Sequence, residues 1–79
     1  MNVVREVYDS PWEFTLYETD ECFILNVDFC NSFVDFTRSY KVTGEESKLD
    51  FNGIKQLAEL IRKDHESFKN REIIPVVTM

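Results

Sequence analysis

The alternation of apolar and polar residues in the first half of the chain constrains its fold more than any other feature. Apolar side chains at every second position are typical of strands that bury one face of a sheet. The alternating segments cover about residues 3–8, 12–19, 22–30 and 33–42. Turn-forming pairs separate them, namely Ser10-Pro11, Asp20-Glu21 and Asn31-Ser32. We therefore predict four consecutive antiparallel strands joined by short turns.

Two-residue turns at 20–21 and 31–32 also predict how these strands pair. With such turns, each pair on one face of the sheet is apolar against apolar, and a slip by one residue would turn a strand to the wrong face. The predicted pairs are Trp12–Phe29, Phe14–Val27, Leu16–Leu25, Phe29–Val34 and Val27–Phe36. We expect these residues, together with Phe23, to form the sheet side of the core.

A helical period replaces the alternation in the second half of the chain. Its apolar stripe repeats at intervals of three and four residues, and consists of Ile54, Leu57, Ala58, Ile61, His65 and Phe68. Asp50 is an N-cap candidate for a helix over about 50–69, and a capping box of Thr43 and Glu46 would allow a start near residue 44. Pro75 interrupts the apolar tail, which is at best a short C-terminal edge strand. The sequence thus predicts one α+β domain over residues 1–79, a four-stranded antiparallel β-meander with one C-terminal amphipathic helix packed on one face.

The charge of the chain is acidic and unevenly distributed. The 79 residues carry a net charge of −6. Residues 1–47 hold ten acidic and three basic residues, whereas residues 48–79 hold five acidic and six basic ones. Such a field disfavours nucleic acid, which needs a basic face, and favours a basic partner or a cation. No stretch approaches the roughly 20 apolar residues of a membrane span, and the N-terminal residues have no signal-peptide pattern, so we expect a cytoplasmic protein without membrane contact.

The residues that carry most enzyme chemistry are few and badly placed. His65 lies on the helix stripe that faces the sheet, while Cys22 and Cys30 lie on the opposite sheet face, so a Cys–His pair cannot form. The two cysteines are about 26 Å apart along one strand, which prevents a disulfide. Three Cys and His residues are too few for a structural zinc site, and the only glycines, Gly44 and Gly53, make no phosphate-binding loop. We expect no enzyme activity, no cofactor and no metal.

The sheet face away from the helix carries the candidate binding residues. The predicted register places Asp28 between Glu13 and Asp35, and a tight turn at Ser10-Pro11 would add Tyr8 beside Glu13. Like charges directly opposite each other destabilise a sheet. The row is therefore either a merely solvated face or a binding surface. Paired catalytic carboxylates are the weakest reading, because a flat face has no cleft that excludes water.

An apolar row is predicted next to the acidic one. It consists of Val4, Tyr17 and Ile24, on a face that a single helix does not cover. An exposed apolar patch of this kind on a small domain usually binds a partner, and a symmetric dimer is the commonest arrangement. We therefore expect a homodimer, and the candidate binding residues are Tyr8, Glu13, Tyr17, Ile24, Asp28 and Asp35.

Several segments resemble small uncharacterised bacterial proteins, some of which look like immunity proteins encoded beside toxins. The matching segments are residues 12–16 (WEFTL), 23–27 (FILNV), 43–46 (TGEE), 53–54 and 57–61 (LAELI), and the resemblance covers residues 12–71. These motifs are structural and transfer no catalytic residue. The resemblance implies a protein-binding function, such as an immunity-type inhibitor. The alternatives are a small-ligand or divalent-cation binding protein that uses the acidic row, and a structural subunit of a larger assembly.

Overall fold

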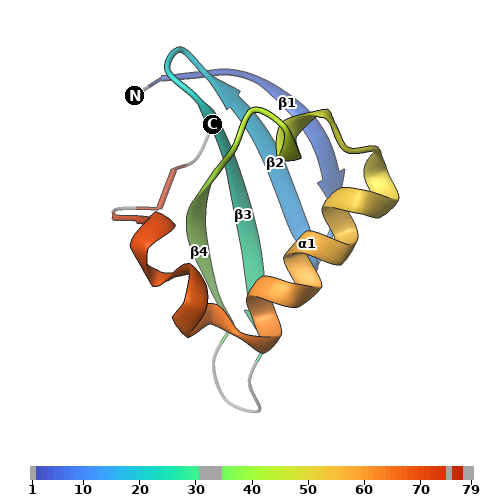
Figure 1. The fold of residues 1–79 in the computed structure, drawn as a ribbon, viewed down its shortest axis with the longest axis vertical. Coiled ribbons are helices and arrows are strands. Elements are labelled where there is room, and N and C mark those ends of the chain that lie inside the picture. Colours follow the sequence, from blue (N-terminus) through green and yellow to red (C-terminus); the bar gives the residue numbers. More distant parts are fainter. Residues whose placement is uncertain (1, 31–34, 75, 78–79) are drawn as a thin grey trace.

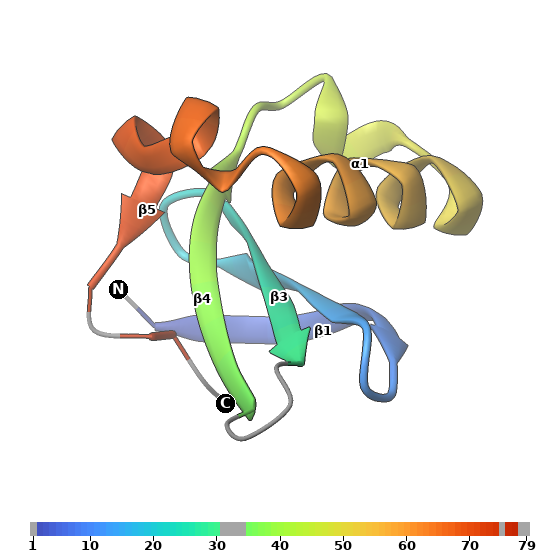
Figure 2. The same cartoon turned by 90° about the horizontal axis from the view of Figure 1, so that it is seen from below.

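The computed structural model describes residues 2–30, 35–74 and 76–77, which form an α+β fold (Figure 1). Five antiparallel strands follow one another in chain order across one sheet. They are β1 (Val3–Ser10), β2 (Phe14–Thr19), β3 (Phe23–Cys30), β4 (Asp35–Val42) and β5 (Glu72–Ile73). The helix α1 (Phe51–Lys63) lies on one face of this sheet, and the segment after β5 runs on the other side (Figure 2). The α+β class, the antiparallel meander and the short C-terminal edge strand are confirmed.

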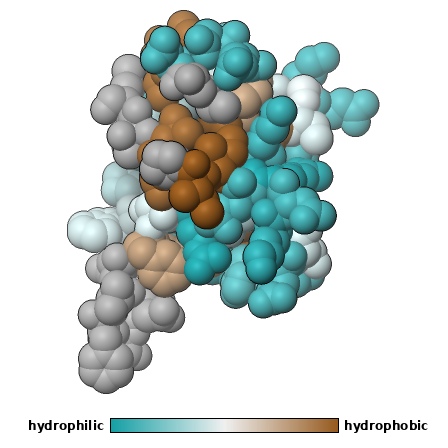
Figure 3. Space-filling view, turned by 90° about the vertical axis from the view of Figure 1, so that its left-hand side faces the viewer, coloured by the Kyte–Doolittle hydropathy of each residue, from teal (hydrophilic) through white to brown (hydrophobic). Residues whose placement is uncertain are grey.

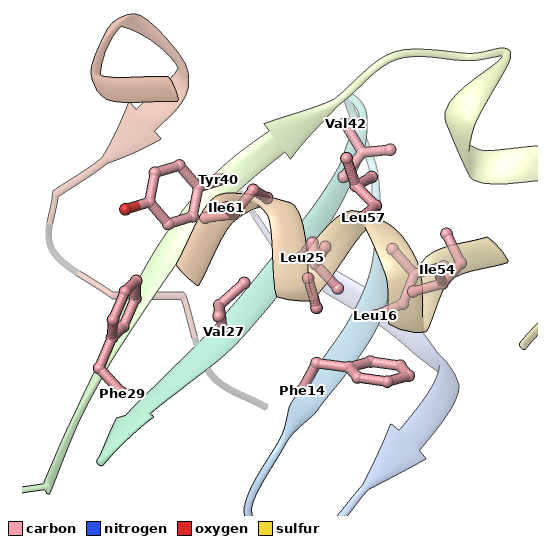
Figure 4. Packing of buried hydrophobic residues seen from close by; sticks show 11 residues of the cluster. Phe14, Leu16, Leu25, Val27, Phe29, Tyr40, Val42, Ile54, Leu57 and Ile61 are labelled. Carbon is pink, nitrogen blue, oxygen red and sulfur yellow. The ribbon is translucent and has the colours of Figure 1, made fainter. Parts of the chain in front are cut away.

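The core lies between α1 and the sheet, as the two apolar patterns predict. Figure 4 shows side chains from β2, β3 and β4 directed toward one side of α1. The buried cluster comprises Phe14, Leu16, Leu25, Val27, Phe29, Tyr40, Val42, Ile54, Leu57, Ala58 and Ile61. Phe23 and Phe36 are partly buried against it. The prediction that Trp12 belongs to the core is wrong. Trp12 precedes β2, in a turn, and its side chain is exposed.

The register between β2 and β3 follows the prediction, but the register between β3 and β4 does not. Phe29 was predicted opposite Val34 but lies opposite Phe36, a shift of two positions. Val34 and the predicted turn at 31–32 lie outside the described residues. An even shift keeps every side chain on its predicted face. It nevertheless separates the predicted acidic pair, because Asp28 lies opposite Thr37, whose hydroxyl donates to its Oδ1 over 2.9 Å. Asp35 lies opposite Cys30, and neither of these side chains is described.

The register between β1 and β2 corrects the position of Tyr8. Tyr8 lies opposite Leu16 rather than Glu13, three positions further along β2. A shift by an odd number of residues moves the Tyr8 side chain to the other face of the sheet. Irregularities of β1 before Tyr8 contribute to this shift. The Tyr8 ring packs edge-on against Phe51 of α1, with 5.7 Å between ring centroids. The predicted position of Tyr8 on the face away from the helix is therefore wrong.

The predicted helix over 50–69 is divided at Asp64. Asp50 caps α1, since its Oδ1 accepts from the Gly53 N–H over 2.8 Å. At Asp64 the backbone leaves the helical region, with φ −136° and ψ 56°, and the 3₁₀ helix η2 (His65–Arg71) follows. The capping box forms reciprocally between Thr43 and Glu46, but it opens the short 3₁₀ helix η1 (Glu46–Lys48) instead of α1. The stripe residue Phe68 still packs on the core from η2.

Candidate functional site

The connection between β1 and β2 is a tight turn that carries an exposed tryptophan. The Glu13 N–H donates to the Ser10 carbonyl oxygen over 3.0 Å. Pro11 takes the second position of the turn and Trp12 the third, where its φ of 70° lies in the left-handed region. This is the pattern of a type II turn, whose third position is ordinarily Gly or Asn. We call residues 10–13 the Trp12 turn.

Trp12 contributes little to the stability of the fold. It is the only tryptophan of the chain, and 77% of its surface is exposed. The left-handed conformation costs a residue with a Cβ about 1–2 kcal/mol. Figure 2 shows the turn as a loop that projects from the end of β1. The side chain thus occupies a strained position without being buried, so its presence there needs a reason other than packing.

Side chains of α1 hold the Trp12 turn against the rest of the domain. Arg62 donates from Nη2 to the Glu13 carbonyl oxygen over 3.0 Å and from Nε to the Asp28 carbonyl oxygen over 3.1 Å. The Lys55 ammonium lies 3.8 Å from Glu13 Oε1, and the Ser10 hydroxyl donates to Glu13 Oε2 over 2.9 Å. The Glu13 carboxylate therefore pairs with a cation on α1, and its predicted place in an acidic row on the opposite face is wrong.

Acidic side chains do gather on the face away from α1, but around Tyr17. Burial raises the pKa of Tyr17 above its ordinary value of 10.0, and the negative charges of Glu6, Asp9 and Asp28 raise it further. We call these three carboxylates the acidic patch. Asp9 immediately precedes the Trp12 turn, and the Asp28 N–H donates to the carbonyl oxygen of Glu13 within it over 2.9 Å. Asp9 and Asp28 therefore lie at the end of the sheet that carries the Trp12 turn, and Glu6 lies further along β1, opposite Tyr17.

The predicted apolar row does not form an exposed surface. Ile24 pairs with Tyr17 as predicted, but it has no exposed surface at all, and Tyr17 is only partly exposed. Val4 is 59% exposed, and Tyr17 lies opposite Glu6 rather than Val4. The expected dimer through this row therefore loses its structural basis.

Two buried polar side chains on the same face bind the C-terminal segment. Asn26 is 4% exposed and Ser39 is not exposed at all. The Asn26 Nδ2 donates to the Val77 carbonyl oxygen over 2.6 Å, and the Val77 N–H donates to Ser39 Oγ over 2.8 Å. The Ser39 hydroxyl in turn donates to Asn26 Oδ1 over 2.6 Å. We call this pair the Asn26–Ser39 bracket. The sequence pattern missed it, because the polar character of Asn26 and Ser39 indicates a solvated face unless the tail is known to lie there.

One buried polar atom lacks a hydrogen-bond partner among the described residues. Tyr40 is 1% exposed, and its hydroxyl is enclosed at the edge of the core without such a partner. Burial raises the pKa of Tyr40 above its ordinary value of 10.0. The charge of Glu72 adds to this effect and Arg38 opposes it.

Two hollows on the surface of the described residues are small. One of about 200 Å³ is lined by Lys41, Val42, Thr43, Asn70 and Arg71, and one of about 180 Å³ by Arg38, His65, Glu66 and Lys69. Sites for drug-sized ligands usually begin near about 300 Å³. Within the part of the chain that the structure describes, no three His, Cys, Asp or Glu side chains are close enough to hold a metal ion.

Among residues 2–30, 35–74 and 76–77, no helix has the length and apolar character needed to cross a bilayer. Comparison with protein-family models, with curated proteins and with solved structures found no match.

Proposed function

We propose that this chain is a small acidic protein-binding domain that contacts its partner through Trp12 and the acidic patch. The observation that carries the proposal is the state of Trp12, which is 77% exposed on a left-handed backbone. Strained residues persist where the surrounding structure holds them, and they concentrate at functional sites. Tryptophan is also among the residues most enriched in the energetic centres of protein interfaces.

The charges near Trp12 define the chemistry of the partner. Glu6, Asp9 and Asp28 are close enough to Tyr17 to raise its pKa together. A partner with a basic surface would be drawn to this end of the sheet, and its association rate would fall as salt screens the charges. The Lys55 ammonium offsets the charge of the Glu13 carboxylate, and the Arg62 guanidinium adds a positive charge at the backbone of the turn, so the negative field is directed away from α1.

The sequence resemblance implies a specific form of this function, an immunity-type inhibitor of a toxin. The same proposal includes a cytoplasmic location and self-association. The divalent-cation alternative has less support, since no three His, Cys, Asp or Glu side chains among the described residues, those of the acidic patch included, are arranged so that they could hold a metal ion. No specific observation favours a structural subunit.

The experiment begins with the 79-residue chain as bait in a lysate of its source cells. A captured protein is identified, purified and titrated against this chain, with the emission of the single tryptophan as the signal. We expect the purified partner to shift Trp12 emission to the blue, and Trp12→Phe or Trp12→Ala to weaken binding. A centre-of-interface residue of this kind contributes at least about 2 kcal/mol, or roughly 30-fold in Kd.

Leu60→Ala is the matched control, because Leu60 is an apolar residue of α1 that is 52% exposed. It should leave the affinity unchanged. Asp9→Asn should slow association at low salt and flatten its salt dependence. Equal affinity of the wild type and Trp12→Ala for the purified partner would contradict the proposal.

A further inference from the structure

We propose that the partner binds as an extended basic segment that adds to the open edge of β1 as a further strand. This inference rests on the proposed function and deepens it, because it states the form of the partner. The backbone of such a segment would form hydrogen bonds with β1, and its Lys or Arg side chains would lie beside the acidic patch. Recognition by strand addition takes its affinity from main-chain hydrogen bonds and its specificity from side chains.

β1 is an edge strand with room for a partner. Figure 1 shows it as the outermost strand of the sheet, with β2 and β3 between it and β4. It has eight residues, and in the part of the chain that the structure describes it pairs only with β2. An edge strand presents unpaired N–H and C=O groups, which are a template for pairing with another chain. The other edge offers less, because β5 has only two residues.

The hydrogen bonds between β2 and β3 determine which backbone groups of β1 point to this edge. The Asp28 N–H donates to the Glu13 carbonyl oxygen over 2.9 Å, and the Thr19 N–H donates to the Cys22 carbonyl oxygen over 2.8 Å. Between these two bonds the register of β2 and β3 is regular. Hydrogen-bonded pairs alternate with non-hydrogen-bonded pairs in such a register. Every second residue from Glu13 to Thr19 therefore directs its backbone groups toward β3 and away from β1.

Two residues of β1 lie opposite these positions. Asp9 lies opposite Thr15, and Glu6 lies opposite Tyr17. Because Thr15 and Tyr17 are bonded to β3, the N–H and carbonyl groups of Asp9 and Glu6 point away from β2, toward the open edge. Outside the strand ladders, none of the backbone hydrogen bonds among residues 2–30, 35–74 and 76–77 involves these groups. The edge thus offers two donors and two acceptors to a further strand.

Two irregularities limit how far a partner strand can pair with β1. They lie between residues 3 and 5 and between residues 6 and 8. Bulges bend an edge and work against pairing with a long, flat strand. We therefore expect pairing over a short stretch from Glu6 to Asp9. This stretch continues directly into the Trp12 turn, so one partner can contact both the edge and the exposed indole.

The charges of this stretch favour a basic segment over a second copy of the chain. Glu6 and Asp9 are exposed, and both belong to the acidic patch. Pairing of two β1 edges would bring these carboxylates of both copies together, and like charges across strands are unfavourable. Arg5, the basic residue of β1, already pairs with Glu18. In a segment with Lys or Arg at every second position, the cations all lie on one face and can meet the acidic patch.

The opposite edge of the sheet has a different chemistry. Figure 3 shows an apolar area, bordered by polar side chains, on the side of the molecule where β5 lies. Ile74 and Val76, which follow β5, are 83% and 40% exposed. The Glu72 carboxylate of β5 is already paired with Arg38. A basic segment is therefore directed to β1 rather than to β5.

Binding of a synthetic peptide to the 79-residue chain tests strand addition. The probe is a short peptide in which Arg and Thr alternate. Its control has the same sequence with N-methylated amides, so that it keeps the charges but loses the donors. Amide hydrogen exchange is followed by nuclear magnetic resonance. We expect the Glu6 and Asp9 amides to exchange at least tenfold more slowly when the peptide is bound, while the Leu60 amide in α1 changes little. The control peptide should bind at least tenfold more weakly.

Two variants at one position separate the backbone from the charge. Asp9→Asn and Asp9→Pro both lose the carboxylate, but only the Pro variant also loses the N–H. An edge strand accepts proline where that N–H faces solvent, and circular dichroism checks that the fold is kept. We expect Asp9→Pro to bind the peptide several-fold more weakly than Asp9→Asn, and equal binding of the two folded variants would contradict pairing through this amide. The exchange and N-methylation measurements use the wild type, so they decide the question even if Asp9→Pro misfolds.

The proposal is overturned by absence of peptide binding at about 1 mM, by equal affinity of the two peptides, or by a bound peptide that leaves exchange of the Glu6 and Asp9 amides unchanged. Trp12→Ala distinguishes its failure from failure of the proposed function. If this variant binds the peptide like the wild type and protects both amides, strand addition holds and the role of Trp12 is wrong. If it loses binding while the wild type binds both peptides equally, Trp12 is the contact and strand addition is wrong.

Discussion

Because Trp12 has a left-handed backbone, substitutions at this position can separate its role in the fold from the role of its side chain in binding. Trp12→Gly and Trp12→Ala both remove the indole, of which 77% is exposed, so both lose about the same small amount of packing. They differ only in the backbone. Alanine keeps a Cβ at φ 70°, whereas glycine adopts this conformation without strain.

The magnitude follows from two opposing effects. Relief of the left-handed strain favours glycine by about 1–2 kcal/mol. The greater freedom of glycine in the unfolded chain opposes this by about 0.4–1 kcal/mol. Trp12→Gly should therefore be more stable than Trp12→Ala by about 1 kcal/mol, which corresponds to roughly 4–8 °C in Tm for a domain of this size.

The assay is urea and thermal unfolding followed by far-ultraviolet circular dichroism, because both variants lack the tryptophan signal. The same two variants are then titrated with the purified partner. Both should bind equally weakly, although one is more stable than the other. If Trp12→Ala were as stable as Trp12→Gly, the assignment of the strained type II turn would be refuted. If Trp12→Gly kept wild-type affinity, the indole would not be the contact.

Three further variants test contacts other than those of the Trp12 side chain. Arg62→Ala, which loses two charge-assisted hydrogen bonds to backbone carbonyls, should lower the free energy of unfolding by about 1–3 kcal/mol in urea melts, whereas Lys63→Ala should leave it nearly unchanged. Tyr40→Phe should match or exceed wild-type stability by up to about 1 kcal/mol, because it removes a buried unpaired hydroxyl. Since the pKa of Tyr40 is raised in the folded state, the free energy of unfolding of the wild type should fall above pH 10. The Phe variant should lose less free energy of unfolding over the same range, and an equal loss in both proteins would contradict this. Burial alone would raise the pKa of Glu46, but its hydrogen bonds to Thr43 and its pairing with Arg71 lower it below 4.5. Glu46→Gln should therefore be less stable than the wild type at pH 7, and this difference should shrink as pH falls below 4.5.

Features set by neighbouring residues could be predicted from the sequence. The two-residue turn at 20–21 places Leu16 opposite Leu25, and the reciprocal hydrogen bonds of Thr43 and Glu46 form as their spacing indicates. The stripe of α1 is buried because its period is that of a helix. The shift between β3 and β4 could not be predicted, because alternation with a period of two is unchanged by a shift of two residues.

The candidate site was harder to predict than the fold. Trp12 fits the apolar alternation of β2, and only Pro11 before it indicates a turn whose third residue is left-handed. Asp28 lies opposite Thr37 rather than Asp35, and the carboxylates that act with it on Tyr17 are Glu6 and Asp9, which the irregular pairing of β1 with β2 brings there. The bracket depends on contacts of Val77 with Ser39, 38 positions earlier in the chain, and with Asn26, 51 positions earlier. No local sequence pattern indicates contacts over such separations.

The two faces of the sheet are covered in different ways, and this difference leads to a last prediction. Apolar packing holds α1, whereas hydrogen bonds from Asn26 and Ser39 hold the C-terminal segment. Apolar contact is non-directional, but a bracket that binds one N–H and one carbonyl group fixes the register of the segment at Val77.

Replacing both bracket residues by apolar ones should therefore affect register more than stability. In Asn26→Leu, Ser39→Ala, no buried side-chain group of the bracket is left unpaired, so the free energy of unfolding should change by less than about 1.5 kcal/mol. The single variant Ser39→Ala, which leaves Asn26 buried with an unpaired oxygen, should lose more. Carboxypeptidase should remove residues 76–77 faster from the double variant than from the wild type. A double variant that is less stable than Ser39→Ala, or whose tail is as protected as in the wild type, would mean that packing rather than the bracket positions the segment.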